Sequence, residues 1–361
     1  MTPIWTLPSW PQFSYDSAEL EPLLVHVAEL LGRVKGLHAG LSPKERERII
    51  LMEITQEALH SFSIEGVKLN PDEIKASVVA SLSARNRAGV SRRSDAVVQI
   101  MVEARDPSIK LDQSRLLTWH RLLFQGTEQE ETGRWRSFDL NIVKSARADR
   151  EEILYAAPPP DQLSQDMADW FAALEQPQQR STPVHAALMH LWFESIHPFS
   201  DGNGRIGRTI IEHIFARSGA LPFSLSRQIE ADKRAYYAAL QAGRRVRDGS
   251  INATPFIKWF LETMIKAADR GLEEARFLIQ RNQYFLTHTK LRPRQEAVLR
   301  RLFQEGTARV ALGLSAKTYG KIAKTSPATT TRDLNEMVAV DALIKSDQGG
   351  RSTRYFLNLP Q

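Results

Sequence analysis

The chain has 361 residues, 42% hydrophobic and 25% charged, which fits a globular protein with two or three domains. It has no cysteine, which excludes disulfides, thiolate catalysis and cysteine-ligated zinc. The net charge is +6, and Pro293–Arg354 holds eleven lysines and arginines against six acidic residues. This basic C-terminal segment fits nucleic-acid binding and an ordinary solvated surface equally well.

The first twenty residues are rich in tryptophan and proline and predict a packed, irregular arm. They show no basic region followed by an apolar run, as a signal peptide would. No stretch of the chain approaches the roughly 18–20 apolar residues of a membrane span. We therefore expect a cytoplasmic protein with no membrane contact.

Helical periodicity begins near Leu20 and continues through the first third of the chain. Asn70, followed by Pro71 and two acidic residues, is a helix-start signal. The helices predicted in this part cover residues 20–41, 43–62, 70 onward, 94–104 and 112–125.

The pattern changes after Gly133. Two β-prone runs, 138–143 and 152–156, flank a polar stretch and predict a β-hairpin that ends at three prolines. Helical patterns then resume and cover residues 161–174, 184–196, 206–219, 234–243, 252–271 and 273–286. The order of elements indicates a mainly α-helical fold with one or two small hairpins.

The motif HPFSDGNGRIGR runs from His197 to Arg208. The helix before it is apolar on nearly all sides, which predicts that it is buried. Pro198 disfavours helical geometry at His197, so the helix ends there and holds His197 at the mouth of a loop. That is a suitable place for a general base.

The rest of the motif suits a polyphosphate. Gly202 and Gly204 permit a tight turn that exposes backbone N–H groups at the start of a new helix. Arg205 and Arg208 share a face of that helix, and Asp201 is a hard oxygen ligand suited to Mg²⁺. Together these residues indicate nucleotide or phosphoryl transfer from a magnesium nucleotide. Taken singly, each is also explained by turn formation, a structural histidine or arginines that bind a carbonyl or an aspartate.

HPFSDGNGRIGR resembles the Fic-domain signature, His-x-Phe-x-Asp/Glu-Gly-Asn-Gly-Arg-x-x-Arg, and matches it at every specified position. The resemblance implies a compact helical core with a β-hairpin flap, here within about residues 137–158. It also implies protein AMPylation, in which AMP from ATP is placed on a Ser, Thr or Tyr hydroxyl and pyrophosphate is released. The flap would align a segment of the target protein by β-augmentation.

The resemblance also assigns roles to individual residues. His197 would be the general base, Phe199 an anchor for the loop and Asp201 the Mg²⁺ ligand. The phosphates would be held by Gly202, Asn203, Gly204, Arg205 and Arg208. The last of these would reach the γ-phosphate. Tyr237 would contact adenine, and the asparagine that the family often has seven residues later is Arg244 here.

A second motif, HSFSIEGVKL, places Ser61 and Glu65 four residues apart on one helical face, with Gly66 next. It resembles the inhibitory motif of Fic proteins, Ser/Thr-x-x-x-Glu-Gly/Asn. A carboxylate paired with Arg208 would occupy the γ-phosphate site and misalign ATP. Glu65 could also position water to remove AMP. Without the Fic motif, this stretch would be an ordinary helix end capped by Gly66.

The predicted organisation has three parts. Residues 1–85 resemble the accessory domain that precedes Fic cores in many bacterial proteins, and they carry the inhibitory motif Ser61–Gly66. Residues 86–290 form the catalytic core. Residues 291–361 predict three helices and a two-stranded wing, which together resemble a winged helix-turn-helix module.

This tail offers candidate contacts to double-stranded DNA, with Ser326 as the N-cap of the recognition helix. The residues that could face a groove or a phosphate are Thr329, Thr330, Arg332 and Arg351, with Lys317, Lys321, Lys324 and Arg354 as further phosphate contacts. Winged helices also serve in protein docking and dimerisation, so both kinds of partner remain open.

Three functions fit the sequence. The first is an autoinhibited protein adenylyltransferase that uses ATP and Mg²⁺, acts on a target hydroxyl or on itself, and forms a homodimer as family members often do. The second is a DNA-binding regulator whose Fic core is a sensor or a relic, although a relic would be expected to lose motif residues. The third is a Fic enzyme with another donor, although the phosphotransferase branch usually departs from Gly-Asn-Gly-Arg.

Overall fold

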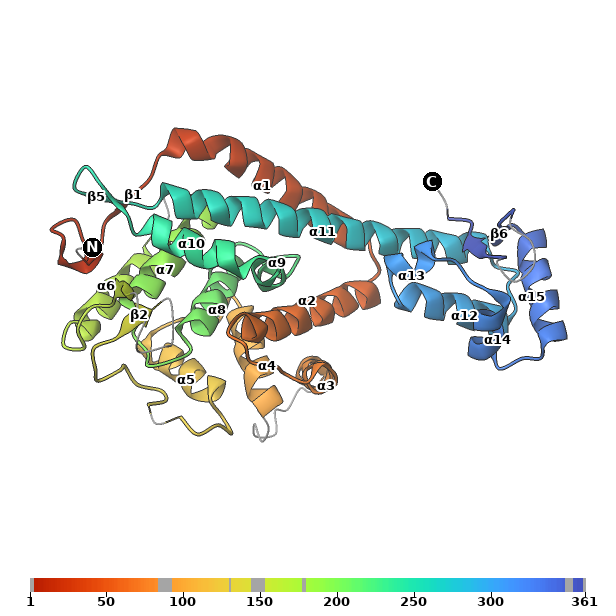
Figure 1. The fold of residues 1–361 in the computed structure, drawn as a ribbon, viewed down its shortest axis with the longest axis horizontal. Helices are drawn as coiled ribbons and strands as arrows, with labels where there is room; N and C mark the ends of the chain where they lie inside the picture. The colour runs from red at the N-terminus through yellow and green to blue at the C-terminus, as the bar shows by residue number, and fades with distance from the viewer. Residues whose placement is uncertain are drawn as a thin grey trace. The chain divides into compact units, whose positions relative to one another are not determined.

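The computed structural model describes residues 3–83, 93–129, 131–143, 153–176, 180–347 and 353–359. These residues are mostly helical and include three small sheets (Figure 1). The chain divides into two compact units, Met1–Gly271 and Leu272–Gln361. None of the helices in the described ranges combines the length and the apolar character that a membrane crossing requires.

The first unit combines the predicted accessory segment with most of the predicted core. Its elements in chain order are η1 (Ile4–Thr6), β1 (Phe13–Ser14), α1 (Ser17–Ala39), α2 (Pro43–Ile64), α3 (Pro71–Ser83), α4 (Arg93–Ala104), α5 (Gln113–Leu123), β2 (Asn141–Val143), β3 (Ile153–Ala156), α6 (Leu163–Glu175), α7 (Thr182–Ile196), α8 (Asn203–Ala216), α9 (Leu225–Ala231), α10 (Lys233–Gly243), β4 (Val246–Arg247), β5 (Ser250–Asn252) and the first part of α11 (Thr254–Thr287).

Helix α7 lies at the centre of the first unit. Its side chains from Val184 to Ile196 are buried, as its apolar sequence predicts. It packs along α8 and also contacts α6 and α10 (Figure 1). Because α7 ends directly before His197, this buried helix fixes where His197 lies.

Helix α2 carries the second motif. Ser42 and Glu45 form a capping box at its start, with Pro43 in the first helical position. The helix ends at Ile64, and the chain turns at Gly66, which has a φ of 76°. Since α2 packs against α3, α4, α8 and α9, the end of this helix has a defined place beside the core.

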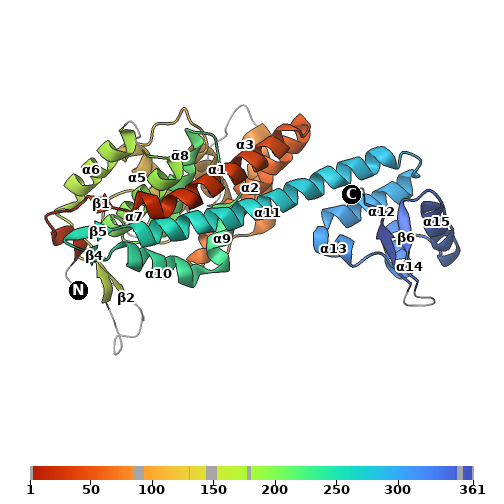
Figure 2. The ribbon, with the colours of Figure 1, turned by 90° about the horizontal axis from the view of Figure 1, so that it is seen from above.

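Two of the sheets belong to the first unit. The predicted hairpin is formed by β2 and β3, which are antiparallel with Ile142 opposite Tyr155. The sheet β1-β5-β4 was not predicted; it lies beside the start of α11, and Phe13 pairs with Ile251 in its parallel part (Figures 1 and 2). The N-terminal arm is therefore not irregular throughout. A strand of two residues is too short to show alternation in the sequence.

The second unit contains the last part of α11 and a small domain with a core of its own. The further elements are α12 (Pro293–Gln304), α13 (Thr307–Ala311), α14 (Ala316–Ala323), α15 (Pro327–Ala339), β6 (Leu343–Lys345) and β7 (Tyr355–Leu357). The two strands are antiparallel, with Ile344 opposite Phe356. The buried core residues include Tyr284, Leu299, Tyr319, Leu334 and Leu357.

Two expectations about these helices were wrong. The pattern predicted separate helices that meet near Gly271, but α11 is continuous from Thr254 to Thr287. A glycine inside a helix costs only about 1 kcal/mol, and Leu272 and Ala275 are buried and continue the apolar face. Helix α13 is an addition to the three predicted tail helices. Its five residues are too few to reveal a helical period.

Candidate active site

The last turn of α7 is fastened by side chains from elsewhere in the first unit. The carbonyls of Glu194 and Ser195 accept hydrogen bonds from Arg244 Nη2 at 2.6 Å and from the Tyr155 hydroxyl at 2.8 Å. The carbonyl of His197, directly after the helix, accepts one from Arg136 Nε at 3.0 Å. His197 itself has a φ of 50°, in the left-handed region. That conformation is costly for a residue other than glycine, and the surrounding bonds offset the cost. The imidazole therefore starts from a fixed backbone position.

Arg136 joins this turn to the hairpin. Its Nη1 donates to the carbonyl of Phe138 at 2.6 Å, and its Nη2 donates to the carbonyl of Pro158 at 2.5 Å. One buried guanidinium thus holds both ends of the hairpin and the carbonyl of His197. Sequence reasoning missed Arg136 and Tyr155, because no local pattern marks a side chain that caps a distant helix.

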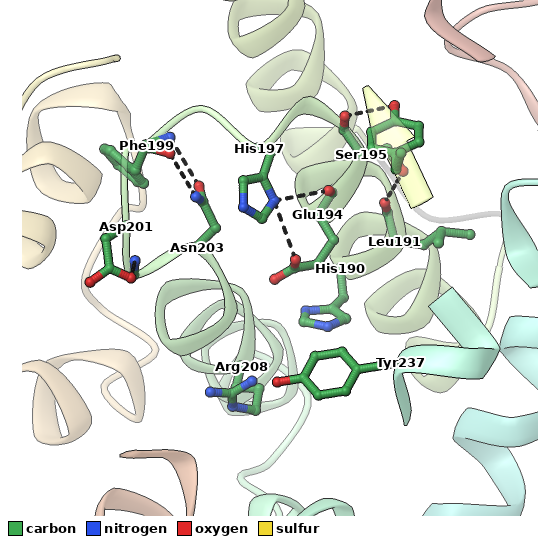
Figure 3. Close-up of polar contacts among 12 residues, drawn as sticks. His190, Leu191, Glu194, Ser195, His197, Phe199, Asp201, Asn203, Arg208 and Tyr237 are labelled. Atoms are coloured by element: carbon green, nitrogen blue, oxygen red, sulfur yellow. Dashed lines mark hydrogen bonds and ion pairs between the residues drawn. The ribbon is translucent and has the colours of Figure 1, made fainter. Parts of the chain in front are cut away.

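The ring of His197 faces Glu194, one helical turn earlier. Nδ1 of His197 lies 3.3 Å from the carbonyl oxygen of Glu194 and 3.6 Å from its carboxylate Oε2 (Figure 3). Burial and then the charge of Arg244 lower the pKa of His197 to about 3. The ring is therefore neutral at pH 7. When Nδ1 carries the hydrogen and donates it to the carbonyl, Nε2 is left as a proton acceptor.

The motif loop is braced from within. Asn203 Oδ1 accepts from the backbone N–H of Phe199 at 2.9 Å, and Nδ2 donates to the carbonyl of Phe199 at 2.8 Å (Figure 3). The ring of Phe199 is buried and stacks on His120 with 3.8 Å between centroids. His120, which the sequence did not indicate, also contacts the carbonyl of Asp201 at 3.0 Å. The side chain of Asn203 therefore holds the loop together.

Two glycines of the motif sit where a side chain would not fit. Gly202 has a φ of 83°, and a Cβ there would lie 2.7 Å from Leu123 Cδ2. A Cβ on Gly204 would overlap the carboxylate of Glu65. Helix α8 begins between these two glycines. Because the carboxylate of Glu65 lies against Gly204, the end of α2 closely approaches the first backbone N–H groups of α8.

Arg205 is buried between aromatic rings. Its guanidinium lies 5.4 Å from the ring centroid of Phe62 and 4.9 Å from that of Phe124. Its Nη2 donates to Asp201 Oδ2 at 3.0 Å. The Asp201 side chain is 55% exposed, so it meets both this arginine and the solvent. The pair keeps one positive charge fixed beside the start of α8.

Arg208 connects the two motifs. Its Nη2 donates to Glu65 Oε1 at 2.9 Å and to the carbonyl of Ser61 at 2.7 Å, and its Nε donates to Ser61 Oγ at 3.0 Å. The Tyr237 hydroxyl donates to the other oxygen of Glu65 at 3.4 Å, and Figure 3 shows Tyr237 next to Arg208. Arg208 is 2% exposed, so this ion pair is shielded from water on one side.

Most of the motif loop lines one pocket of about 940 Å³, whereas Arg205 and Arg208 lie behind its wall and are not among the lining residues. The end of α2, strand β2, the motif loop and helix α10 all contribute to its wall. The candidate residues that line it are Glu65, His197, Asp201, Gly202, Asn203, Gly204, Tyr237 and Arg244. Tyr237 is 42% exposed, whereas Arg244 is buried and stacks on the Tyr155 ring at 4.2 Å. Arg244, which stands where Fic proteins often have asparagine, thus bonds to the last turn of α7.

The donors present fit a cation that is shared with a phosphate ligand. Among the described residues, no three histidine, aspartate or glutamate side chains gather as a metal cage. Asp201 offers a half-exposed carboxylate at the pocket, beside the N-terminus of α8. Mg²⁺ typically takes one or two carboxylates and completes its shell with substrate phosphates and water. Asp201 alone is enough for that arrangement.

The candidate DNA contacts of the second unit are only partly exposed. Arg332 is exposed, as are the tail lysines Lys317, Lys321 and Lys324 and the arginine Arg354. Thr329 is half-buried. The expectation that Thr330 faces a groove was wrong, because it is 3% exposed and its hydroxyl bonds to that of Thr325 at 2.9 Å. Arg351 lies outside the described residues.

Comparison with known proteins identifies two segments. Residues 110–215 match the Fic/DOC family, and residues 4–84 match a domain of unknown function, DUF4172. The chain is 24% identical over 288 residues to "Protein adenylyltransferase Fic" of Nematostella vectensis, covering 77% of this chain and 60% of that protein. It is 31% identical over 126 residues to "Protein adenylyltransferase fic-1" of Caenorhabditis briggsae, covering 35% of this chain and 22% of that protein. The chain thus spans between about a fifth and three fifths of these relatives.

The fold has a solved counterpart. A crystal structure of a Fic family protein from Desulfovibrio desulfuricans aligns with 96% of this chain and 98% of its own, with a TM-score of 0.57 and 23% sequence identity. This confirms the predicted fold class, a mostly helical protein with a Fic-type core.

Proposed function

Because this chain contains a Fic/DOC-family domain, we propose that it is a protein adenylyltransferase, which transfers AMP from Mg-ATP to a hydroxyl side chain of a protein. One observation carries the proposal. A neutral histidine, the first residues of α8 and strand β2 line one pocket together with Glu65, whose carboxylate bonds to Arg208. The names of the adenylyltransferase relatives agree with it.

His197 would take the proton. In the transfer, the target hydroxyl oxygen bonds to the α-phosphorus, the bond from that phosphorus to pyrophosphate breaks, and the hydroxyl proton moves to Nε2 of His197. A neutral ring can accept this proton, and its low pKa keeps it neutral at pH 7. The fixed backbone of residue 197 limits the positions the ring can take, which supports in-line attack.

The phosphates would lie at the start of α8. The backbone N–H groups of Gly204 and its neighbours, together with Arg205 and Arg208, supply positive potential there. Asp201 would hold Mg²⁺, which would neutralise phosphate charge. The side chain of Asn203 bonds to the backbone of Phe199, so its contribution would be to stabilise the conformation of the motif loop.

The target would dock on the hairpin. β3 pairs with one edge of β2, and β2 also lines the pocket. An extended segment added to the free edge of β2 would run past His197 and present a hydroxyl to it. This arrangement supports a protein substrate over a small molecule.

The ion pair between Glu65 and Arg208 would keep the enzyme inactive. The carboxylate of Glu65 pairs with the guanidinium of Arg208, which a γ-phosphate would otherwise bind, and it lies against Gly204 in the same pocket. A nucleotide that binds beside it would be displaced from the in-line geometry. Release of Glu65 would be the activating step. The same carboxylate could position a water molecule for removal of AMP.

A second candidate function, DNA binding, belongs to the second unit. It is favoured by the exposed basic side chains of Lys317 and Lys321 on α14, Lys324 directly after it and Arg332 on α15. Basic side chains at this spacing suit phosphate contacts. This function is compatible with transferase activity in the same chain.

The test is intact-mass spectrometry of three proteins: wild type, Glu65→Gly and His197→Ala. Each is incubated with Mg²⁺ and with ATP, GTP, CTP or UTP in turn. We expect an added AMP in Glu65→Gly with ATP, little in wild type and none in His197→Ala. If Glu65→Gly gains no adduct and releases no pyrophosphate with any nucleotide, the proposal is wrong.

A further inference from the structure

Glu194 is a buried acid in contact with the candidate base. Its carboxylate is 6% exposed, and Oε2 lies 3.6 Å from Nδ1 of His197. Its other oxygen, Oε1, has no hydrogen-bond partner within the described residues. The position lies before the signature motif, so the motif gives it no role.

Helix α8 makes room for this carboxyl group. A Cβ at Gly207 would lie 2.9 Å from Oε1 of Glu194 and 2.8 Å from the ring of His190. Any larger residue at 207 would therefore push Glu194 out of place. The glycine lies between Arg205 and Arg208, at a position that the signature leaves unspecified. In this chain it accommodates the acid, which lines the pocket.

We propose that Glu194 is a positioning residue for His197. Its carbonyl holds the neutral ring, and its carboxylate stabilises the imidazolium that forms when the ring takes a proton. The inference rests on the proposed transfer reaction. The proton that leaves the target hydroxyl ends on Nε2, and the positive ring then faces the negative carboxylate across 3.6 Å. Of the other charges near the ring, those of Arg244 and Arg136 oppose its protonation, and that of Asp201 favours it.

The charges around Glu194 come from several elements. Tyr236 on α10 and Arg244 directly after it face the Glu194 carboxyl, as do Arg208 on α8 and Glu65 at the end of α2. His190 on α7 and His197 directly after that helix also lie against it. Burial raises the pKa of Glu194 to about 7, Arg244 and Arg208 act against this, and Glu65 adds to it. The ionised form therefore becomes populated as the pH rises through neutrality.

The pH dependence of the transfer rate follows from the ionisation of Glu194. Above its pKa, Glu194 is a carboxylate and supports the imidazolium, so the transfer rate rises with pH. Removal of Glu65 takes away a neighbouring negative charge, which lowers the pKa of Glu194. In the Glu65→Gly protein the rise should thus be centred below the wild-type value of about 7.

The experiment uses the full chain in the Glu65→Gly background. The initial rate of AMP incorporation is measured from roughly pH 5.5 to pH 9 for the parent, Glu194→Gln, Glu194→Asp and a control, Glu212→Gln. Glu212 is also buried, its pKa is also raised by burial to about 7, and its Oε1 also lacks a hydrogen-bond partner, but it bonds to Arg105 and does not line the pocket. It therefore controls for the loss of a buried acid.

We expect Glu194→Gln to remove the pH-dependent rise and to lower the plateau on the order of 10-fold or more, with little change in KM for ATP. Glu194→Asp should keep the rise, and Glu212→Gln should keep both rise and plateau. Equal profiles for the parent and a folded Glu194→Gln protein would overturn the inference. So would loss of the rise in Glu212→Gln.

A second measurement does not need activity. Nitrogen-15 NMR of labelled histidine, with His197→Ala to assign the signal, follows the ring of His197 across the same pH range. The signal should show the titration of Glu194 in the parent and lose it in Glu194→Gln. If the parent transfers no AMP but shows this titration, the proposed function fails while the contact stands. If the titration is absent from the parent, the inference is wrong.

Discussion

Replacement of Glu230 by alanine should loosen the end of α2 without a change in the pocket itself. Glu230 lies on α9, where one carboxylate oxygen accepts from the Ser63 hydroxyl and the other pairs with Nδ1 of His60. Ser63 is two residues before Glu65. The substitution therefore removes two anchors next to Glu65, which pairs with Arg208.

The expected size follows from the exposure of these groups. The side chains of His60 and Glu230 are 26% and 29% exposed, so each bond to this carboxylate is worth only about 0.5–1 kcal/mol. Two such bonds give about 1–2 kcal/mol, which corresponds to an increase of about 5–30-fold in the released population. The helix keeps a second anchor, because buried Glu57 accepts from Ser226 N–H at 3.0 Å and from Ser224 Oγ at 2.7 Å.

The assay is the initial rate of AMP incorporation at saturating ATP. Glu230→Ala should be about 5–30-fold faster than wild type, and slower than Glu65→Gly. Hydrogen exchange should rise at residues 60–66 in Glu230→Ala. The matched control is Glu47→Ala. Glu47 is an exposed glutamate near the start of α2, and its replacement should change neither the rate nor the exchange.

One result would refute the reasoning: Glu65→Gly is active, Glu230→Ala has the wild-type rate, and its exchange at residues 60–66 is unchanged. The contacts from α9 would then play no part in holding Glu65. Faster exchange with an unchanged rate would also count against it, because loosening would then not release the site.

Two further predictions concern the motif loop and the tail. Gly202→Ala should lower the free energy of unfolding by about 1–3 kcal/mol, because alanine is strained at a φ of 83° and its Cβ would meet Leu123, and denaturant unfolding measures this loss. A wild-type unfolding free energy in that variant would contradict the geometry. Lys317→Glu with Lys321→Glu should abolish a gel shift of duplex DNA at moderate salt, since both side chains are exposed. No shift by the wild-type chain on any duplex would argue for protein docking.

The sequence predicted the features that depend on near neighbours in the chain. The end of α7 at residue 196 follows from Pro198, and the buried character of α7 follows from its composition. A helix after the glycine turn was also predicted, but from residue 206, whereas α8 begins at Asn203, directly after Gly202 with its φ of 83°. The pairing of β2 with β3 follows from two β-prone runs.

Side chains that act across the fold were not predictable. His120 lies 79 positions before Phe199, and the stacking of the two rings requires α5 to lie beside the loop. Nothing near Arg136 or Tyr155 marks them as partners of the last turn of α7. The departure at Arg244 was visible in the sequence, but its reason, a hydrogen bond to that turn, depends on how α10 packs.

The guanidinium of Arg136 has a consequence for attempts to redirect the protein to new targets. It bonds to the carbonyls of Phe138 and Pro158, which lie at the two ends of the hairpin, and to the carbonyl of His197. A hairpin transplanted from a relative would therefore carry the histidine's alignment with it. Grafts with junctions inside residues 140–154 leave these anchors and the Tyr155 hydroxyl untouched. If the proposed function holds, such exchanges would alter which partner docks and leave the backbone position of His197 unchanged.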